Sequence, residues 1–350
     1  MRRLALLAAL GVLLALPAAA SAHGGATTAV DYRSLVTGVP AGVDVSVVGG
    51  DDRLAVTRDG ADEVIVLGYD GEPYLRLDDD GVWENERSPA VGLNAERQQG
   101  AAAGDADPKA EPSWRKISGG DTVLFHDHRA HWMGSQPPAA VREDPGTARR
   151  LADWSVPVVI DGQAGSITGY YRYEPPPSKA LWLGVLAALA LAASVVVWRL
   201  EGPRRRLALW ILAGAAVLPA PVLGAAETHD LPDTGVDVAA GQAVYTVLIG
   251  ALAAGAWWAR RDPAAEAAIL AVAALAVGAF ALVGRLALLD HGVVPSALPG
   301  WLARTLLAIG LAATIAVAVG AVATWRDTLA RVPTKGGGAR PPRKEPEEAW

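Results

Sequence analysis

The sequence contains no cysteine, and this absence excludes several kinds of site. Without a thiol the chain can form no disulfide, thiolate zinc site, iron–sulfur cluster or cysteine nucleophile. It has only two phenylalanines and two methionines, and one of these methionines is the initiator. A domain without disulfides has to be held together by its apolar core alone, and a domain of about 155 residues is large enough to form one.

The chain also lacks a cluster of basic residues in the part that is expected outside the membrane. Its formal net charge is −6, and an acidic chain of this kind argues against a nucleic-acid partner. It has no phosphate-binding glycine loop, no nucleophile elbow and no zincin motif. No enzymatic activity is therefore expected from its motifs.

The few histidines, in contrast, are concentrated in one place. Three of the six lie between Phe125 and Met133, in the sequence FHDHRAHWM. Imidazole nitrogens and a thioether are side-chain ligands of copper and similar metals. This stretch predicts a metal site, with copper as the expected ion.

Residues 1–22 have the pattern of a secretory leader. Arg2 and Arg3 precede an apolar run over residues 4–16, and residues 20–22 (Ala-Ser-Ala) form a small-residue cleavage site. The alternative is an uncleaved first membrane helix, for which the apolar run is short. Cleavage after Ala22 would make His23 the amino terminus, where its amine and its ring offer two nitrogens to one metal ion.

Residues 23–178 are predicted to form an extracellular all-β domain. Short β-prone runs alternate with Gly and Asp turns, which indicates an antiparallel β-sandwich of the immunoglobulin or cupredoxin kind. A loop is expected over residues 98–112 and a stiff proline spacer at 175–177. The strands are expected at 43–48, 53–57, 63–69, 74–77, 122–126, 156–160 and 167–173.

Residues 179–325 are predicted to form an all-α bundle of five membrane spans, with a disordered tail over 326–350. The apolar runs are about as long as a bilayer requires. Arginine and lysine follow the first, third and fifth runs, whereas the other loops carry only acidic charge, so the positive-inside rule predicts a multi-pass protein of the cell membrane. Its amino-terminal domain is then outside and its carboxyl end cytoplasmic. The runs cover residues 180–198, 207–226, 243–258, 267–284 and 305–324.

Alternate residues of a strand share one face, so His126 and His128 are expected to point together. His131 and Met133 have the other parity and need a turn or bulge to join them. With the two nitrogens of His23, the pair would surround Cu(II) in a plane, whereas Met133 would favour Cu(I). The alternative is that the pair is a hydrogen-bonded structural feature with no metal.

His23 together with His126 and His128 resembles the histidine brace of exported copper proteins. The similar proteins are the CopC-like copper-resistance domains and the β-sandwich domains of particulate methane monooxygenase. The resemblance implies copper bound by the amino-terminal histidine and the later His-x-His, and it is confined to these residues. The strings at 68–76 (GYDGEPYLR) and 126–133 (HDHRAHWM) also resemble those of actinobacterial exported membrane proteins of unassigned function.

Three functions follow from these expectations. The first is a membrane-anchored, cell-surface metal-binding protein that holds or hands on copper through His23, His126, His128, His131 and Met133. The second is a non-metal interaction module, tethered to the membrane, for a protein partner in the envelope. The third is a copper-dependent redox enzyme, which ranks last because the sequence indicates no substrate pocket.

Overall fold

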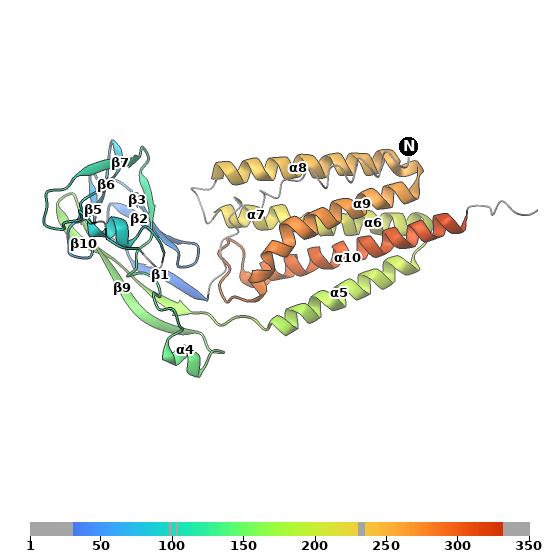
Figure 1. Ribbon diagram of the computed structural model, residues 1–350, viewed down its shortest axis with the longest axis horizontal. Helices are drawn as coiled ribbons and strands as arrows, with labels where there is room; N and C mark the ends of the chain where they lie inside the picture. Colours follow the sequence, from blue (N-terminus) through green and yellow to red (C-terminus); the bar gives the residue numbers. More distant parts are fainter. Residues whose placement is uncertain (1–30, 98–99, 103, 230–234, 332–350) are drawn as a thin grey trace, which may run out of the picture.

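The strands and the long helices occupy separate halves of the molecule (Figure 1). The structure, a computed structural model, describes residues 31–97, 100–102, 104–229 and 235–331. Within these residues the strands lie between residues 32 and 173, and the long helices follow from residue 179. The predicted leader and His23 lie outside the described residues.

The described strands pair antiparallel in two sheets. One sheet has seven strands in the order β1-β10-β9-β4-β5-β6-β7, and the other has three in the order β2-β3-β8. The strands are β1 (Tyr32–Gly38), β2 (Val43–Val48), β3 (Arg53–Arg58), β4 (Val64–Leu67), β5 (Pro73–Asp78), β6 (Gly81–Asn85), β7 (Trp114–Ser118), β8 (Thr122–Phe125), β9 (Arg149–Ile160) and β10 (Gln163–Tyr173). Two short helices, α3 (Pro89–Leu93) and α4 (Ala139–Glu143), lie in the connections.

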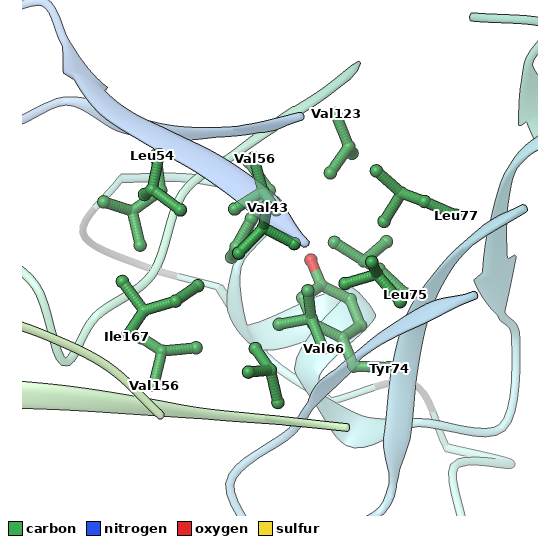
Figure 2. Packing of buried hydrophobic residues seen from close by; sticks show 14 of the residues in the cluster. Val43, Leu54, Val56, Val66, Tyr74, Leu75, Leu77, Val123, Val156 and Ile167 are labelled. Carbon is green, nitrogen blue, oxygen red and sulfur yellow. The ribbon is translucent and has the colours of Figure 1, made fainter. Parts of the chain in front are cut away.

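The two sheets share one apolar core (Figure 2). Val56 of β3 and Val156 of β9 come from different sheets, and neither is exposed to solvent. Leu75 and Leu77 of β5 point into this core, and Arg76 between them points away from it, as the strand period of two requires. Burying one such valine or leucine contributes about 1.5–3 kcal/mol. In a chain without disulfides, this core is what holds the domain together.

Most of the predicted strands are present at nearly the predicted residues. The strand over 43–48 has the predicted bounds, and the Asp161–Gly162 turn joins β9 to β10. Asp161 and Gly162 have φ angles of 49° and 76°, the left-handed values that two-residue hairpin turns favour. Strands β1, β6 and β7 were not predicted, and β9 begins seven residues before the predicted 156.

Within the described residues, four helical stretches are long and apolar enough to cross a membrane. They correspond to the first, second, fourth and fifth predicted runs, and they cover residues 179–199, 202–227, 263–289 and 300–330. The third predicted run lies in α8 (Gly235–Trp258), which packs beside α9 (Pro263–Val277). Helix α10 (Gly300–Ala330) packs against α9, α5 (Lys179–Arg199) and α6 (Gly202–Val217).

Arg285, near the outer end of the fourth predicted run, is paired within the bundle. Its guanidinium donates to both carboxylate oxygens of Glu227 in α7 (Pro219–His229), at 2.7 and 2.6 Å. A charge inside a bilayer is costly unless it is paired.

The β-domain and the helical bundle meet at the start of β1. Asp31 accepts a hydrogen bond from the Gly292 N–H at 2.8 Å, and Lys179 pairs with Asp290 at 2.6 Å. Arg304 of α10 donates to the carbonyl of His291 at 2.7 Å. The Asp31 contact holds the loop before α10 against the start of β1, and the other two hold the same loop to the helices.

Candidate metal site

The histidine segment, residues 126–133, follows directly after β8. The strand ends at Phe125, so the segment is a loop and His126 is its first residue. The alternation of the strand nevertheless continues for three more residues. Asp127 is buried like Phe125, whereas His126 and His128 on the other side are half-buried.

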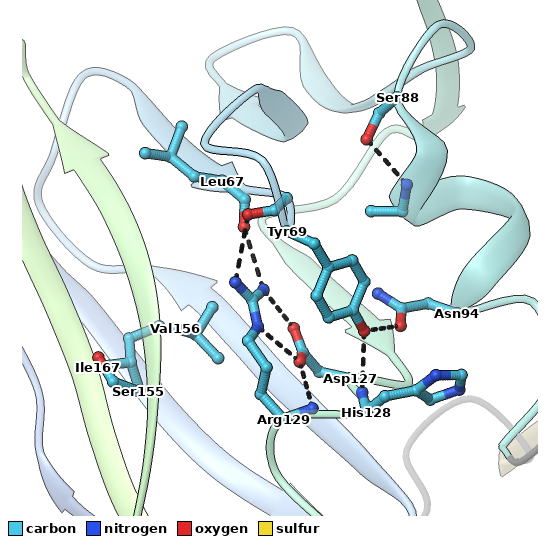
Figure 3. A network of polar contacts seen from close by, with 12 residues as sticks. Leu67, Tyr69, Ser88, Asn94, Asp127, His128, Arg129, Ser155, Val156 and Ile167 are labelled. Carbon is cyan, nitrogen blue, oxygen red and sulfur yellow. Dashed lines mark hydrogen bonds and ion pairs between the residues drawn. The ribbon is translucent and has the colours of Figure 1, made fainter. Parts of the chain in front are cut away.

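A buried ion pair holds this loop in place (Figure 3). Asp127 is 1% exposed, and Arg129 donates to its two oxygens at 2.8 and 2.6 Å. The same guanidinium donates to the carbonyls of Leu67 at 3.1 Å and Gly68 at 3.3 Å. Two-point pairing of this kind is strong and fixes the geometry of both partners. The histidine segment is thereby tied to the end of β4.

Tyr69 supports the loop from the other side. Its hydroxyl accepts a hydrogen bond from the backbone N–H of His128 at 3.1 Å and donates to the side-chain oxygen of Asn94. Burial raises the pKa of Tyr69 to about 12, so its hydroxyl remains a donor at neutral pH. The Arg129 guanidinium lies 4.8 Å from the centre of the Tyr69 ring. None of these contacts requires a metal.

Each of the three histidines has one ring nitrogen bonded to a backbone carbonyl. His126 Nδ1 lies 2.8 Å from the oxygen of Asp52. His128 Nε2 lies 3.0 Å from that of Glu96, and His131 Nδ1 lies 3.3 Å from that of Trp132. A carbonyl only accepts, so the bonded nitrogen carries the hydrogen and the opposite nitrogen keeps a lone pair. Metal-ligating histidines are oriented in this same way.

His131 is the most deeply buried of the three, at 2% exposed. Burial and, to a lesser extent, the nearby Arg97 charge lower the pKa of His131 to about 4, so the ring is neutral at physiological pH. Its centroid lies 5.6 Å from that of His128. A metal–nitrogen bond of about 2.0 Å limits two rings on one ion to roughly 6 Å. This pair therefore lies within the range that a shared ion allows.

Asp51, in the β2–β3 turn (residues 49–52), is a buried carboxylate that the sequence did not identify. It is 3% exposed, and Arg97 donates to its Oδ1 at 2.7 Å. Burial raises the pKa of Asp51 to about 6, against the opposing effect of Arg97. With Ser34, Asp127 and His131 it lines a small cavity that has no room for a water molecule.

Sheet register explains why Asp51 lies near the histidine segment. Leu54 of β3 pairs with Phe125 of β8, so the residues before Leu54 lie opposite those after Phe125. More than seventy residues separate Asp51 from the segment in the sequence. The Gly49-Gly50-Asp51-Asp52 string indicates only a turn.

The predicted ligands are brought together in part. His128 and His131 are in ring contact, and His126 begins the same loop. Met133, at 36% exposed, lies at the surface, and His23 lies outside the described residues. Over the described residues, no three histidine, aspartate or glutamate side chains are grouped closely enough to bind one metal ion.

Comparison of the chain with protein-family models, with curated proteins and with solved structures finds no match. What the protein does therefore has to follow from its own residues and their contacts.

Proposed function

We propose that the protein is a membrane-anchored, cell-surface metal-binding protein that binds and handles copper through the histidine segment. One observation carries this proposal: three histidines of a single loop each have one nitrogen fixed by a carbonyl and the other left with a lone pair. Three such rings in eight residues are more than a purely structural loop needs.

Copper suits these residues better than other common metals. Imidazole nitrogens and a thioether are available, whereas the thiolates of most structural zinc sites are not, because the chain has no cysteine. Since the described residues supply fewer than three converging ligands, the processed amino end has to complete the site. Ser34 lines the same cavity as His131 and follows His23 by 11 residues, and an extended chain covers about 3.5 Å per residue. The chain is long enough for His23 to reach the segment.

The expected effect is a loss of copper binding when the half-buried histidines are removed. The full-length protein, purified in detergent with its leader processed, should bind one Cu(II) per chain. The double variant His126→Ala/His128→Ala should lose more than ~100-fold in Cu(II) affinity. Loss of a residue that only orients a metal ligand costs ~10–100-fold. Calorimetric titration and electron paramagnetic resonance measure this directly.

His291→Ala is the matched control, because His291 lies at the junction with the bundle and contacts Asp31. It should leave the copper affinity unchanged. Equal binding by the double variant and the wild type would refute the proposed site.

The proposal also includes the type of β-fold, the number of membrane spans and their orientation. Two sheets over one core support a β-sandwich of the immunoglobulin or cupredoxin kind. The apolar helix α8 beside α9 supports a fifth span, and the loop charges support an outer β-domain with a cytoplasmic carboxyl end. Removal of residues 1–22 would precede copper binding.

Cysteine labelling tests this orientation, because a chain without cysteine allows single thiols to be placed uniquely. Gln163→Cys at the exposed start of β10 should react with a membrane-impermeant maleimide on intact cells. Ala330→Cys at the exposed end of α10 should react only after the cells are opened. The reverse pattern would contradict the proposed topology.

A second candidate function is a non-metal interaction module for an envelope protein. The contacts of Asp127, Arg129 and Tyr69 favour it, because they hold the loop in place without any ion. Absence of copper binding by the wild type, with the fold intact, would leave this function as the better account.

A further inference from the structure

We propose that Arg33, Arg172 and Arg150 form a binding site for the headgroups of anionic phospholipids, in the leaflet on the side of the β-domain. These three residues, the arginine row, lie side by side across the neighbouring strands β1, β10 and β9. Arg172 is the register partner of both Arg33 and Arg150. The site does not depend on copper binding.

The arginine row lies on the outer face of the seven-stranded sheet. Ser34 is buried beneath the sheet, so its neighbour Arg33 points to the opposite, outer side. Arg172 pairs with Arg33 and shares that side. The Arg150 guanidinium lies 4.2 Å from the ring centre of Tyr170, which has the same parity in β10 as Arg172. All three guanidinium groups are therefore on one face.

Three like charges directly opposite one another destabilise a sheet. Carboxylates offset two of them: Arg172 pairs with Glu174 at 2.9 Å, and Arg150 donates to Asp153 at 2.8 Å. Arg33 is exposed and has no ion pair with any residue that the structure describes. A bound anion between Arg33 and Arg172 would remove their repulsion. Guanidinium groups bind phosphate oxygens in pairs, which makes a phosphate group the fitting anion.

The arginine row is close to the bilayer surface. Figure 1 shows the start of β1 and the end of β10 on the side of the β-domain that faces the helices. Asp31 accepts a hydrogen bond from Gly292, in the loop of residues 290–299 that joins two of the membrane-spanning stretches. Arg33 follows Asp31 by two residues, which cover about 7 Å in a strand. The headgroup layer is about 5–7 Å thick on each side of a bilayer, and arginine side chains extend toward it.

A lipid phosphate fits this position better than a phosphate ion in solution. The bilayer holds its headgroups next to the row at a high effective concentration. Each arginine near an anionic surface strengthens association by about 5-fold, so three together favour anionic over zwitterionic lipid by roughly 100-fold. A zwitterionic headgroup also carries a cation, which the row repels.

The test uses the full-length protein in lipid nanodiscs, with one fluorophore beside the row. Because the chain has no cysteine, Leu35→Cys can be labelled alone, and it shares the outer face with Arg33. The quencher is a nitroxide near the top of the acyl chain, carried either by phosphatidylglycerol or by phosphatidylcholine. In the wild type, phosphatidylglycerol should quench more strongly at the same mole fraction. In Arg33→Gln/Arg172→Gln, half-maximal quenching should need about 25-fold more phosphatidylglycerol, so the preference should vanish.

Arg87→Gln/Arg115→Gln is the matched control, because it removes the same charge beside β6 and β7, at the opposite edge of the sheet. It should keep the wild-type preference. Neither double variant removes a buried side chain, so both proteins should fold. Inorganic phosphate in the buffer distinguishes the two sources of phosphate. A preference that inorganic phosphate abolishes would assign the row to a soluble anion and overturn the proposal.

Two other results would also overturn it. The first is equal quenching by the two lipids in the wild type, as expected if the row bound an acidic protein. The second is a preference for phosphatidylglycerol that persists in Arg33→Gln/Arg172→Gln.

Discussion

Arg129→Ala is expected to lower the free energy of unfolding of the β-domain by about 3–5 kcal/mol, because it leaves the Asp127 carboxylate buried and unpaired. The carbonyls of Leu67 and Gly68 lose the guanidinium at the same time. Pulse proteolysis of the full-length protein in urea, with cleavage in the β-domain as the readout, measures this loss.

Arg150→Ala is the matched control for this experiment. Arg150 also pairs with an aspartate, Asp153, but their side chains are 57% and 72% exposed. Solvent screens such a pair, and its loss should change stability by less than about 1 kcal/mol. Equal effects at the two positions would show that the Asp127–Arg129 pair does not hold the loop.

The second large effect is a pH dependence of stability, and it appears only when Asp51 or His131 is replaced. In the folded protein, burial raises the pKa of Asp51 to about 6 and lowers the pKa of His131 to about 4. Between these values the folded pair carries one proton, on Asp51. The unfolded pair also carries one proton there, on the histidine. Since both states bind the same number of protons at these two residues, the pair should add almost no pH dependence to the stability of the metal-free wild type from pH 4 to 6.

Asp51→Asn removes one half of this balance. The pKa of His131 is still lowered by burial in the folded state. The free energy of unfolding of this variant is therefore greatest above the unfolded histidine pKa of about 6.5. It decreases by about 3 kcal/mol as the pH falls toward 4. Urea midpoints of chelator-treated protein, measured by pulse proteolysis at pH 4, 5, 6 and 7, follow this loss.

His131→Asn should show the opposite slope. The raised pKa of Asp51 means that stability is greatest below about pH 4 and falls as pH rises through 6, again by about 3 kcal/mol. Parallel pH profiles for the wild type and both variants would mean that neither group titrates in the buried cavity.

Local sequence signals predicted much of the fold. The alternation at 43–48 and the Asp161–Gly162 turn depend on neighbouring residues only, and both are present. The apolar runs likewise correspond to helices, because crossing a bilayer requires length and apolar composition more than specific packing. Strand β7 was missed because its sequence, WRKIS, is mostly exposed at a sheet edge and lacks an apolar alternation. Strand β6 lies in a stretch that combines acidic and aromatic residues.

The site could be predicted only where its residues are close in sequence. The histidine cluster and the alternation in burial over residues 126–128 followed from spacing alone. The Asp127–Arg129 pair has the right spacing too, but its burial depends on β4 and Tyr69. Asp51 was not predictable, because the pairing of β3 with β8 brings it to the segment across more than seventy residues. The Arg285–Glu227 pair likewise depends on how two helices pack.

The most direct test of copper binding at the histidine segment is a Cu(II) titration of the full-length protein with two different amino ends. One form begins at His23, verified by mass spectrometry, and the other carries one extra residue before it. We predict one tightly bound Cu(II) per chain in the first form, with nitrogen hyperfine structure in its resonance spectrum, and a much weaker site in the second. Equal affinities in the two forms, or no binding in either, would contradict the account.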